Sequence, residues 1–211
     1  MNKEKLQEIE NKMNKLKVIG YKETKLKSES RFIDIIKGIY NLNNGKIIDR
    51  EKTVKKIGSS NATVVFAMTK ENNIILVIQP RTSLPTKDKM SIELPAGYID
   101  KEEDGLKAAK RELEEETGYT SNNLILLDSY YPSLGASSER IDLVIALDCI
   151  HTKDQHLDTD EFVEYIEVTK EEFKYLLNNN YIKDANSRIG YYKALEYLNR
   201  WLVWARKKRE N

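Results

Sequence analysis

The chain has 211 residues, of which 40% are hydrophobic and 33% charged, and its 35 basic side chains nearly balance 34 acidic ones. This composition excludes a disordered chain, and the net charge of +1 excludes an overall field that attracts nucleic acid or an acidic membrane. The single cysteine, Cys149, excludes an internal disulfide framework and a zinc site built on cysteines. Because we find neither an apolar run near the ~20 residues of a membrane helix nor a signal-peptide core, we expect a cytoplasmic protein.

Apolar spacing and turn signals predict the elements of the first half. Four apolar residues at helical spacing predict an amphipathic helix over residues 3–17. Residues 31–57 are predicted to form strands around an Asn-Asn-Gly turn. Three further apolar runs predict strands at 62–68, 74–79 and 91–94.

The second half begins with a loop and a predicted helix over residues 104–117, which Gly118 ends as a C-terminal cap. Such a mixture of strands with interspersed and terminal helices predicts an α/β layered domain. We expect residues 1–57 to be an N-terminal helix and strand region, and residues 58–211 to be the main domain. The remaining predicted elements are strands at 124–130, 141–148 and 162–168, and helices at 169–178 and 184–207.

The predicted helix carries four glutamates within the stretch RELEEETGY, residues 111–119. Residues three and four apart share a helix face, so Glu112, Glu115 and Glu116 present three carboxylates on one side. Glu114 lies off this face and is expected to be solvated. The apolar stripe of Leu106, Ala109 and Leu113 is expected to turn another side toward the core.

Like charges on adjacent turns destabilise a helix by roughly 0.2–0.5 kcal/mol per pair, so this cluster needs an explanation. A solvated face, or cancellation by Lys107, Lys110 and Arg111, are the structural alternatives. Neither explains a carboxylate face that contains no base. Clustered carboxylates suit a hard divalent cation, and Mg²⁺ often accepts phosphate oxygens of a substrate into its coordination shell.

The flanking residues complete a longer pattern from Gly97 to Tyr119, GYIDKEEDGLKAAKRELEEETGY. Its glycines, glutamates, arginine and apolar positions have the spacing of the Nudix box, so the chain resembles a Nudix hydrolase. The resemblance implies a loop–helix–loop motif on a Nudix α/β/α sandwich with a mixed sheet. It also implies cleavage, dependent on Mg²⁺ or Mn²⁺, of a nucleoside diphosphate linked to another group.

The same resemblance implies roles for the residues of the box. Glu112, Glu115, Glu116 and the carbonyl oxygen of Ala96 resemble the metal ligands of the family, and Glu115 is also a catalytic candidate. Gly97 permits the turn that brings the backbone toward the metal. Arg111 and Glu103 resemble an internal ion pair that orients the loop and the ligands. Mutual repulsion is expected to raise the pKa values of the glutamates while the site lacks metal.

Further segments resemble the ADP-ribose and ADP-sugar pyrophosphatases of this family. Those segments are ELPAG at 93–97, IILVIQPR at 74–81, YPSLGASSE at 131–139 and KDANS at 183–187. The resemblance also implies a homodimer formed through a small N-terminal antiparallel sheet. Two features depart from the subfamily, because Leu134 replaces a proline and the extra N-terminal helix has no counterpart.

These features together predict hydrolysis of ADP-ribose or a related nucleoside diphosphate sugar to AMP and a sugar phosphate. The candidate bases are Glu139 and the acidic loop with Asp160 and Glu161, for which plain solvation is the alternative. Substrate contacts are predicted for Arg50, Arg81, Glu93 and Gly97. The two arginines suit phosphate or the nucleobase, and a surface ion pair is the alternative for either. A GDP-sugar, a dinucleoside polyphosphate, or a catalytically silent nucleotide-binding regulator remain alternatives.

Overall fold

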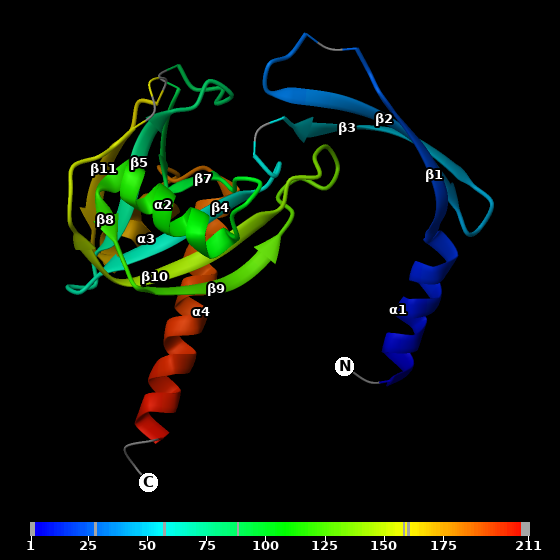
Figure 1. Ribbon diagram of the computed structural model, residues 1–211. Coiled ribbons are helices and arrows are strands. Elements are labelled where there is room, and N and C mark those ends of the chain that lie inside the picture. The colour runs from blue at the N-terminus through cyan, green and yellow to red at the C-terminus, as the bar shows by residue number, and fades with distance from the viewer. Residues whose placement is uncertain are drawn as a thin grey trace. The chain divides into compact units, whose positions relative to one another are not determined.

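The computed structural model describes residues 3–207 except residues 28, 57, 88, 158 and 160, and its helices and strands are labelled in Figure 1. The chain divides into two compact units. One comprises residues 1–56 and 133–139, and the other comprises residues 57–132 and 140–211. The division expected from the sequence, 1–57 and 58–211, stays a prediction; it assigned the short segment 133–139 to the main domain.

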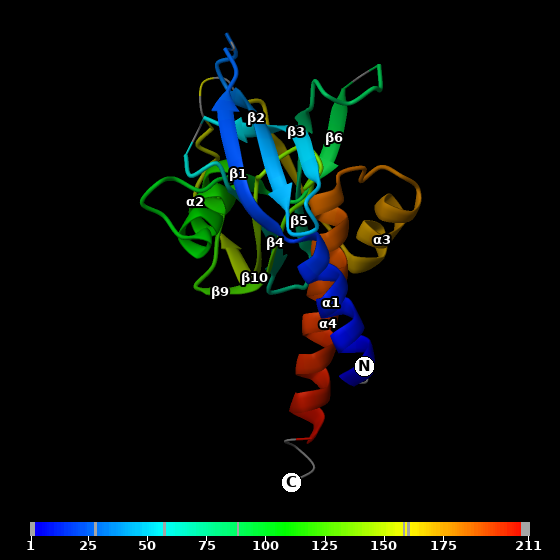
Figure 2. The same ribbon diagram turned by 90° about the vertical axis from the view of Figure 1, so that its right-hand side faces the viewer.

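The first unit is a helix followed by a three-stranded antiparallel sheet. Helix α1 (Lys3–Leu16) leads into β1 (Val18–Lys25), which pairs with β2 (Ile33–Leu42), and β2 pairs with β3 (Ile47–Lys55) (Figure 2). The strand β1 was not predicted, because its sequence VIGYKETK is polar and its side chains are mostly exposed. Its backbone pairing with β2, and not a buried apolar face, therefore makes it a strand.

The second unit is built on an eight-stranded mixed sheet with the central order β11-β5-β4-β10-β8. The central pair of β4 and β10 is parallel, and every residue of β4 is buried. Burial on both faces explains the continuous apolar run in this strand. The strands are β4 (Ala62–Thr69), β5 (Ile74–Pro80), β6 (Met90–Glu93), β7 (Ala96–Tyr98), β8 (Tyr119–Thr120), β9 (Asn123–Tyr130), β10 (Ile141–His151) and β11 (Glu164–Val168).

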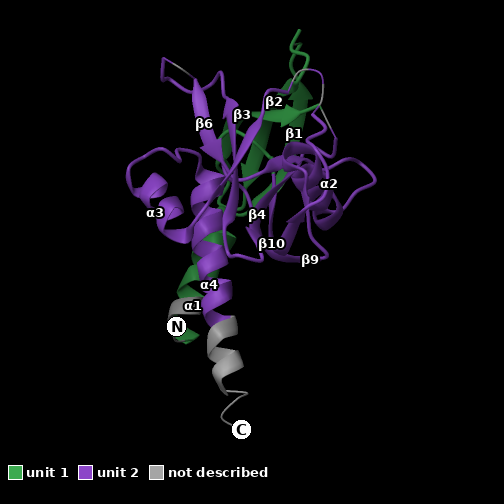
Figure 3. Ribbon diagram, turned by 90° about the vertical axis from the view of Figure 1, so that its left-hand side faces the viewer, with its two compact units in different colours: residues 1–56, 133–139 green, residues 57–132, 140–211 purple. Residues whose placement is uncertain are grey.

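Helices cover both faces of this sheet, which confirms the predicted α/β sandwich. Helix α2 (Gly105–Thr117) lies on one side and α3 (Lys170–Asn178) on the other, as Figure 3 shows. Two separate apolar clusters result, one under α2 and one shared by α3 and α4 (Ala185–Lys207). Among the described residues, no helix is both long and apolar enough to cross a membrane.

Most predicted elements lie within two residues of their observed bounds, and besides β1 the short strands β7 and β8 were not predicted. Residues 97–103 were predicted as loop, but Ala96, Gly97 and Tyr98 pair antiparallel with β4. Three residues without an apolar alternation carry no strand pattern of their own. The neighbouring strand β4 supplies the hydrogen-bonding partner, so this was a wrong prediction that only the tertiary structure corrects.

We expect Phe173→Ala to lower the free energy of unfolding by about 3–5 kcal/mol, the usual cost of truncating a buried phenylalanine. Phe173 is 0% exposed, and its ring stacks 4.8 Å from Tyr191 and lies 6.1 Å from Phe66. Urea denaturation measures the change. Tyr175→Ala on the same helix is the control, because Tyr175 is 60% exposed and should lose less than about 1 kcal/mol. Equal losses in both variants would contradict the assigned core.

Candidate functional site

Helix α2 is capped at both ends, which sets its position on the sheet. The carboxylate of Asp104 accepts hydrogen bonds from the backbone N–H of Leu106 (3.1 Å) and Lys107 (2.9 Å). Gly118 ends the helix in the left-handed conformation with φ 72°, as predicted. A Cβ at Gly118 would lie 2.0 Å from the carbonyl oxygen of Lys153, so glycine is needed there for space as well.

Two of the glutamates lie on the buried face of α2 and not on a separate side. Glu112 is 8% exposed and Glu116 is 3% exposed, on the face that also carries Ala109. The expectation that Leu106 points to the core is wrong, because its side chain is 39% exposed. The helix therefore turns carboxylates toward the sheet, where burial makes their negative charge costly.

Arg111 is the counter-charge of this cluster. Its guanidinium donates to Glu103 through Nε (3.0 Å) and Nη2 (2.9 Å), and to the carbonyl oxygen of Tyr98 (2.8 Å). Its Nη1 donates to Glu112 (2.8 Å) and Glu115 (3.0 Å). The expected ion pair with Glu103 is present, and it lowers the pKa of Glu103. However, the expectation of a carboxylate face without a base is wrong, because Arg111 reaches around to that face.

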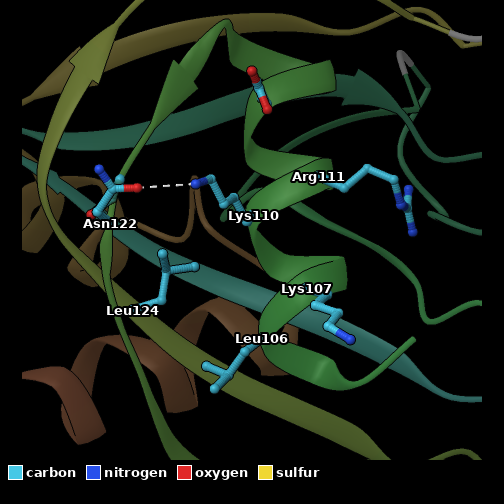
Figure 4. A pocket seen from close by; sticks show the side chains of 8 residues that line it. Leu106, Lys107, Lys110, Arg111, Asn122 and Leu124 are labelled. Atoms are coloured by element: carbon cyan, nitrogen blue, oxygen red, sulfur yellow. Dashed lines mark hydrogen bonds between the residues drawn. The ribbon is translucent and has the colours of Figure 1, made fainter. Parts of the chain in front are cut away.

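The outer surface of α2 is different in character. Lys110 donates to the side-chain oxygen of Asn122 at 3.1 Å, and Arg111 extends away from both in Figure 4. Glu114 forms an ion pair with Lys153 at 2.8 Å, as a surface residue can, and takes no part in the cluster. Arg111 is thus the basic side chain of α2 that reaches Glu112 and Glu115.

Burial is the main cause that raises the pKa of Glu112 to about 7 and the pKa of Glu116 to about 8. Repulsion adds to it, from Glu115 and Glu161 on Glu112, and from Glu112 and Glu161 on Glu116. Of these two causes of the raised pKa values, only the repulsion was expected from the sequence. Glu116 keeps one compensating hydrogen bond, which it accepts from the backbone N–H of Ala96 at 3.0 Å.

The loop before α2 approaches the glutamates closely. A Cβ on Gly97 would lie 2.0 Å from the carboxyl carbon of Glu112, so only glycine leaves room for that carboxylate. The backbone of Ala96 is held at the same place by its bond to Glu116. The two residues predicted to shape the site therefore lie against the predicted ligands.

These donors suit a hard divalent cation. Mg²⁺ and similar ions take carboxylate oxygens as ligands. Without such an ion, the negative charge of buried carboxylates is costly. Among the described residues, however, no three acidic, histidine or cysteine side chains are already gathered as a coordinating group. Arg111 holds Glu112 and Glu115 by hydrogen bonds, so the roles of the ligands stay a prediction.

Arg81, which follows β5, and Glu93, the last residue of β6, form a second ion pair. Arg81 donates from Nε (3.0 Å) and from Nη2 (2.7 Å) to the carboxylate of Glu93, which is 7% exposed. Burial opposes the charge of Arg81, but the bond to Glu93 and the nearby charges of Glu116 and Asp184 raise its pKa. The structure thus brings Arg81 and Glu93 together beside Glu116.

The predicted bases lie in different parts of the chain. Glu161 is exposed, and its charge is one of the smaller causes that raise the pKa values of Glu112 and Glu116. Asp160 lies outside the described residues. Glu139 and Arg50 belong to the other unit, where Glu139 forms an ion pair with Lys55 and Arg50 donates to the carbonyl oxygen of Asp49. Their roles at the site stay predictions.

Two residues near the site were missed by sequence reasoning. The side chain of Gln155 donates to the backbone carbonyl oxygens of Glu116 and Val163. Asp184 is partly buried, and one of its oxygens accepts from the N–H of Ser187 at 2.7 Å while the other has no hydrogen-bond partner among the described residues. A glutamine in a polar loop carries no sequence signal, whereas Asp184 stands where a helix N-cap is expected.

The chain is similar to known proteins of one family. The NUDIX domain model matches residues 59–187. The chain is 38% identical to the ADP-ribose pyrophosphatase of Bacillus subtilis over 170 residues, 80% of this chain and 85% of the relative. It is also 38% identical to the methanol dehydrogenase activator of Bacillus methanolicus over 138 residues, 65% of this chain and 71% of the relative.

A solved structure of an ADP compounds hydrolase has the same fold. It superposes with a TM-score of 0.70 at 19% identity and covers 89% of this chain and 96% of its own. Because the NUDIX model matches more than half of the residues, and the B. subtilis relative is similar over most of its length, the chain belongs to the Nudix hydrolase family.

Proposed function

We propose that this protein hydrolyses the diphosphate bond of ADP-ribose or a related nucleoside diphosphate sugar, giving AMP and a sugar phosphate. The observation that carries the proposal is the buried pair of Glu112 and Glu116 on helix α2, within the Nudix-box pattern. The similarity to the ADP-ribose pyrophosphatase of B. subtilis supports the choice of substrate.

Mg²⁺ is the proposed cofactor, with Mn²⁺ as a substitute. The carboxylates of Glu112, Glu115 and Glu116 and the carbonyl oxygen of Ala96 would hold it. When bound, such an ion would neutralise diphosphate charge and lower the pKa of the attacking water. The close approach at Gly97 supports this set, because it keeps the Glu112 carboxylate against the loop.

The side chains of the protein supply orientation and proton transfer in this proposal. Arg111, braced by Glu103, holds the glutamates in place against their mutual repulsion. Glu161 accepts the proton of the attacking water, with Glu139 as the alternative base. Arg81, held by Glu93, donates hydrogen bonds to a phosphate oxygen, a role for which a planar guanidinium is suited. Arg50 is proposed to contact the substrate as well.

Other substrates of the same class remain rivals. A GDP-sugar or a dinucleoside polyphosphate carries the same diphosphate, and the carboxylates do not read the base. A silent regulatory protein is the rival of another class, and the relative from B. methanolicus is named as an activator. The complete set of box glutamates favours an enzyme over a silent scaffold.

We further propose a homodimer formed through the N-terminal sheet, in the cytoplasm. The support is the exposed apolar side chains on one face of that sheet, where Ile47 is 67% exposed and Ile39 44%. A surface of this kind on a soluble domain marks an interaction site more often than free surface.

A substrate panel tests the proposed activity. We expect the protein with Mg²⁺ to release AMP from ADP-ribose faster than it turns over ADP-glucose, GDP-mannose, NADH or diadenosine polyphosphates, measured by chromatography of the products. A faster reaction with another member would transfer the proposal to that substrate. No turnover of any member by folded protein would contradict the enzyme reading.

Residues that only hydrogen-bond to metal ligands typically contribute about 10–100-fold to metal affinity or activity. Because Glu116 is a proposed ligand itself, we expect Glu116→Gln to lower kcat by more than about 100-fold. Circular dichroism should show an unchanged fold, since glutamine still accepts the hydrogen bond from Ala96. Glu114→Gln is the matched control, because this side chain pairs with Lys153 on the helix surface. Near-normal activity of Glu116→Gln would remove the proposed ligand set.

The raised pKa values predict how pH affects stability without metal. Carboxyls with pKa values raised from 4.5 to about 7 and about 8 stabilise the fold fully below about pH 4.5. This contribution is lost as pH rises through those raised values. With a chelator present, we therefore expect the melting temperature to fall by at least about 4 °C between about pH 5.5 and about pH 8.5.

Excess Mg²⁺ should restore stability more at the higher pH, because the ion binds the ionised carboxylates. Differential scanning calorimetry measures both series. The Glu116→Gln variant should show a flatter pH dependence than the parent protein. A melting temperature that rises with pH in the chelated protein would contradict the assignment.

A further inference from the structure

The loop that follows β10 is hydrogen-bonded to the C-terminal end of helix α2. The last carbonyl groups of a helix have no partner inside it and need other donors. Here the N–H of His156 donates to the carbonyl of Glu115 at 2.9 Å, and the N–H of Thr152 donates to that of Gly118 at 3.0 Å. The loop thus follows the C-terminal turn of α2.

One side chain in this loop makes a contact of another kind. The amide nitrogen of Gln155 donates to the carbonyl oxygen of Glu116 at 2.5 Å and to that of Val163 at 3.1 Å. Gln155 is partly buried, and Val163 is 6% exposed. A single NH₂ group therefore joins the backbone of a site glutamate to the chain that enters β11.

The second of these bonds bears on Glu161. Val163 follows Glu161 by two positions, and two residues of chain span at most about 7 Å. The bond to the Val163 carbonyl therefore limits how far the backbone of Glu161 can move from the chain that Gln155 ties to α2. Besides this bond, the loop is tied to α2 by the backbone contacts of residues 152 and 156 and by the ion pair of Lys153 with Glu114.

We propose that Gln155 is a positioning residue, which sets the distance between Glu161 and the carboxylates of α2 by bonding both backbones at once. The inference rests on the proposed function, in which Glu161 is the base. Gln155 does not touch substrate in this proposal. It acts through Glu161, and a displacement of about 1 Å in a reacting group can cost about 100-fold in rate.

A purely structural role makes a different prediction. If Gln155 only satisfied the end of the helix, its replacement would lower stability and leave the turnover of the folded protein unchanged. The kinetic parameters of folded variants therefore separate the two roles. Displacing the base lowers kcat. KM stays near its parent value, because the contacts that bind the substrate in its ground state are unchanged.

The test uses the full chain with Mg²⁺ and ADP-ribose. Gln155→Leu has similar size and loses both hydrogen bonds, and we expect kcat to fall at least about 10-fold with KM changed less than about 3-fold. Gln155→Glu, which has no hydrogen to donate to the two carbonyls, should fall at least as far. His156→Ala is the matched control, because its contact to α2 uses the backbone N–H and survives the substitution.

A double-mutant cycle shows whether the effect passes through Glu161. Glu161→Gln alone should lower kcat by about 100-fold or more, as loss of a general base does. In the Gln155→Leu background the same change should cost at least about 5-fold less, because residues that act as a unit are not additive. Additive losses would overturn the proposal.

Amide hydrogen exchange tests the contact independently of any activity. Gln155→Leu should speed the exchange of the Glu161, Phe162 and Val163 amides, and unchanged exchange would overturn the proposal even for an inactive enzyme. If Glu161→Gln loses activity but Gln155→Leu keeps the parent kcat, the positioning role fails and the proposed function stands. If Glu161→Gln keeps full activity, Glu161 is not the base and Gln155 has nothing to position.

Discussion

Two carboxylates face the sheet from the buried side of α2, and the cost of their desolvation shapes the rest of the site. Glu112 and Glu116 occupy helix positions that would hold apolar side chains in an ordinary packed helix. Burial and mutual repulsion raise both pKa values toward neutral pH. For packing alone, leucines at these two positions would make the fold more stable than buried carboxylates do. The arrangement therefore indicates a binding function.

Three features of the surroundings accommodate the buried carboxylates of Glu112 and Glu116. Arg111 brings one positive charge to Glu112 and Glu115 while its other nitrogens bond Glu103 and the backbone of Tyr98. The N–H of Ala96 donates to Glu116, and the absence of a side chain at Gly97 leaves room for Glu112. The contacts of Ala96, Gly97 and Tyr98 come from the short strand β7, which pairs with β4.

The C-terminal end of α2 joins this arrangement to the loop with Glu161. Gly118 lets the helix end where the backbone of Lys153 passes, and the following residues donate to the free carbonyls of the helix. Helix, loop and sheet edge therefore share one hydrogen-bonded network, in which Gln155 bonds two of the parts directly. Such coupling restricts how far the exposed loop can move relative to the buried carboxylates.

The sequence by itself determined the box, the capped helix, the central strands and the family, because these depend on local spacing and on residue types. It also identified Arg81, Glu93 and Glu161 as candidates near the glutamates. Only the tertiary structure decided that Glu112 and Glu116 face inward, that Leu106 faces out, and that Arg111 reaches three glutamates. The strands β1 and β7 and the contacts of Gln155 likewise depend on partners distant in sequence. Helical spacing tells which residues share a face, but the packing of the helix on the sheet decides which face is buried.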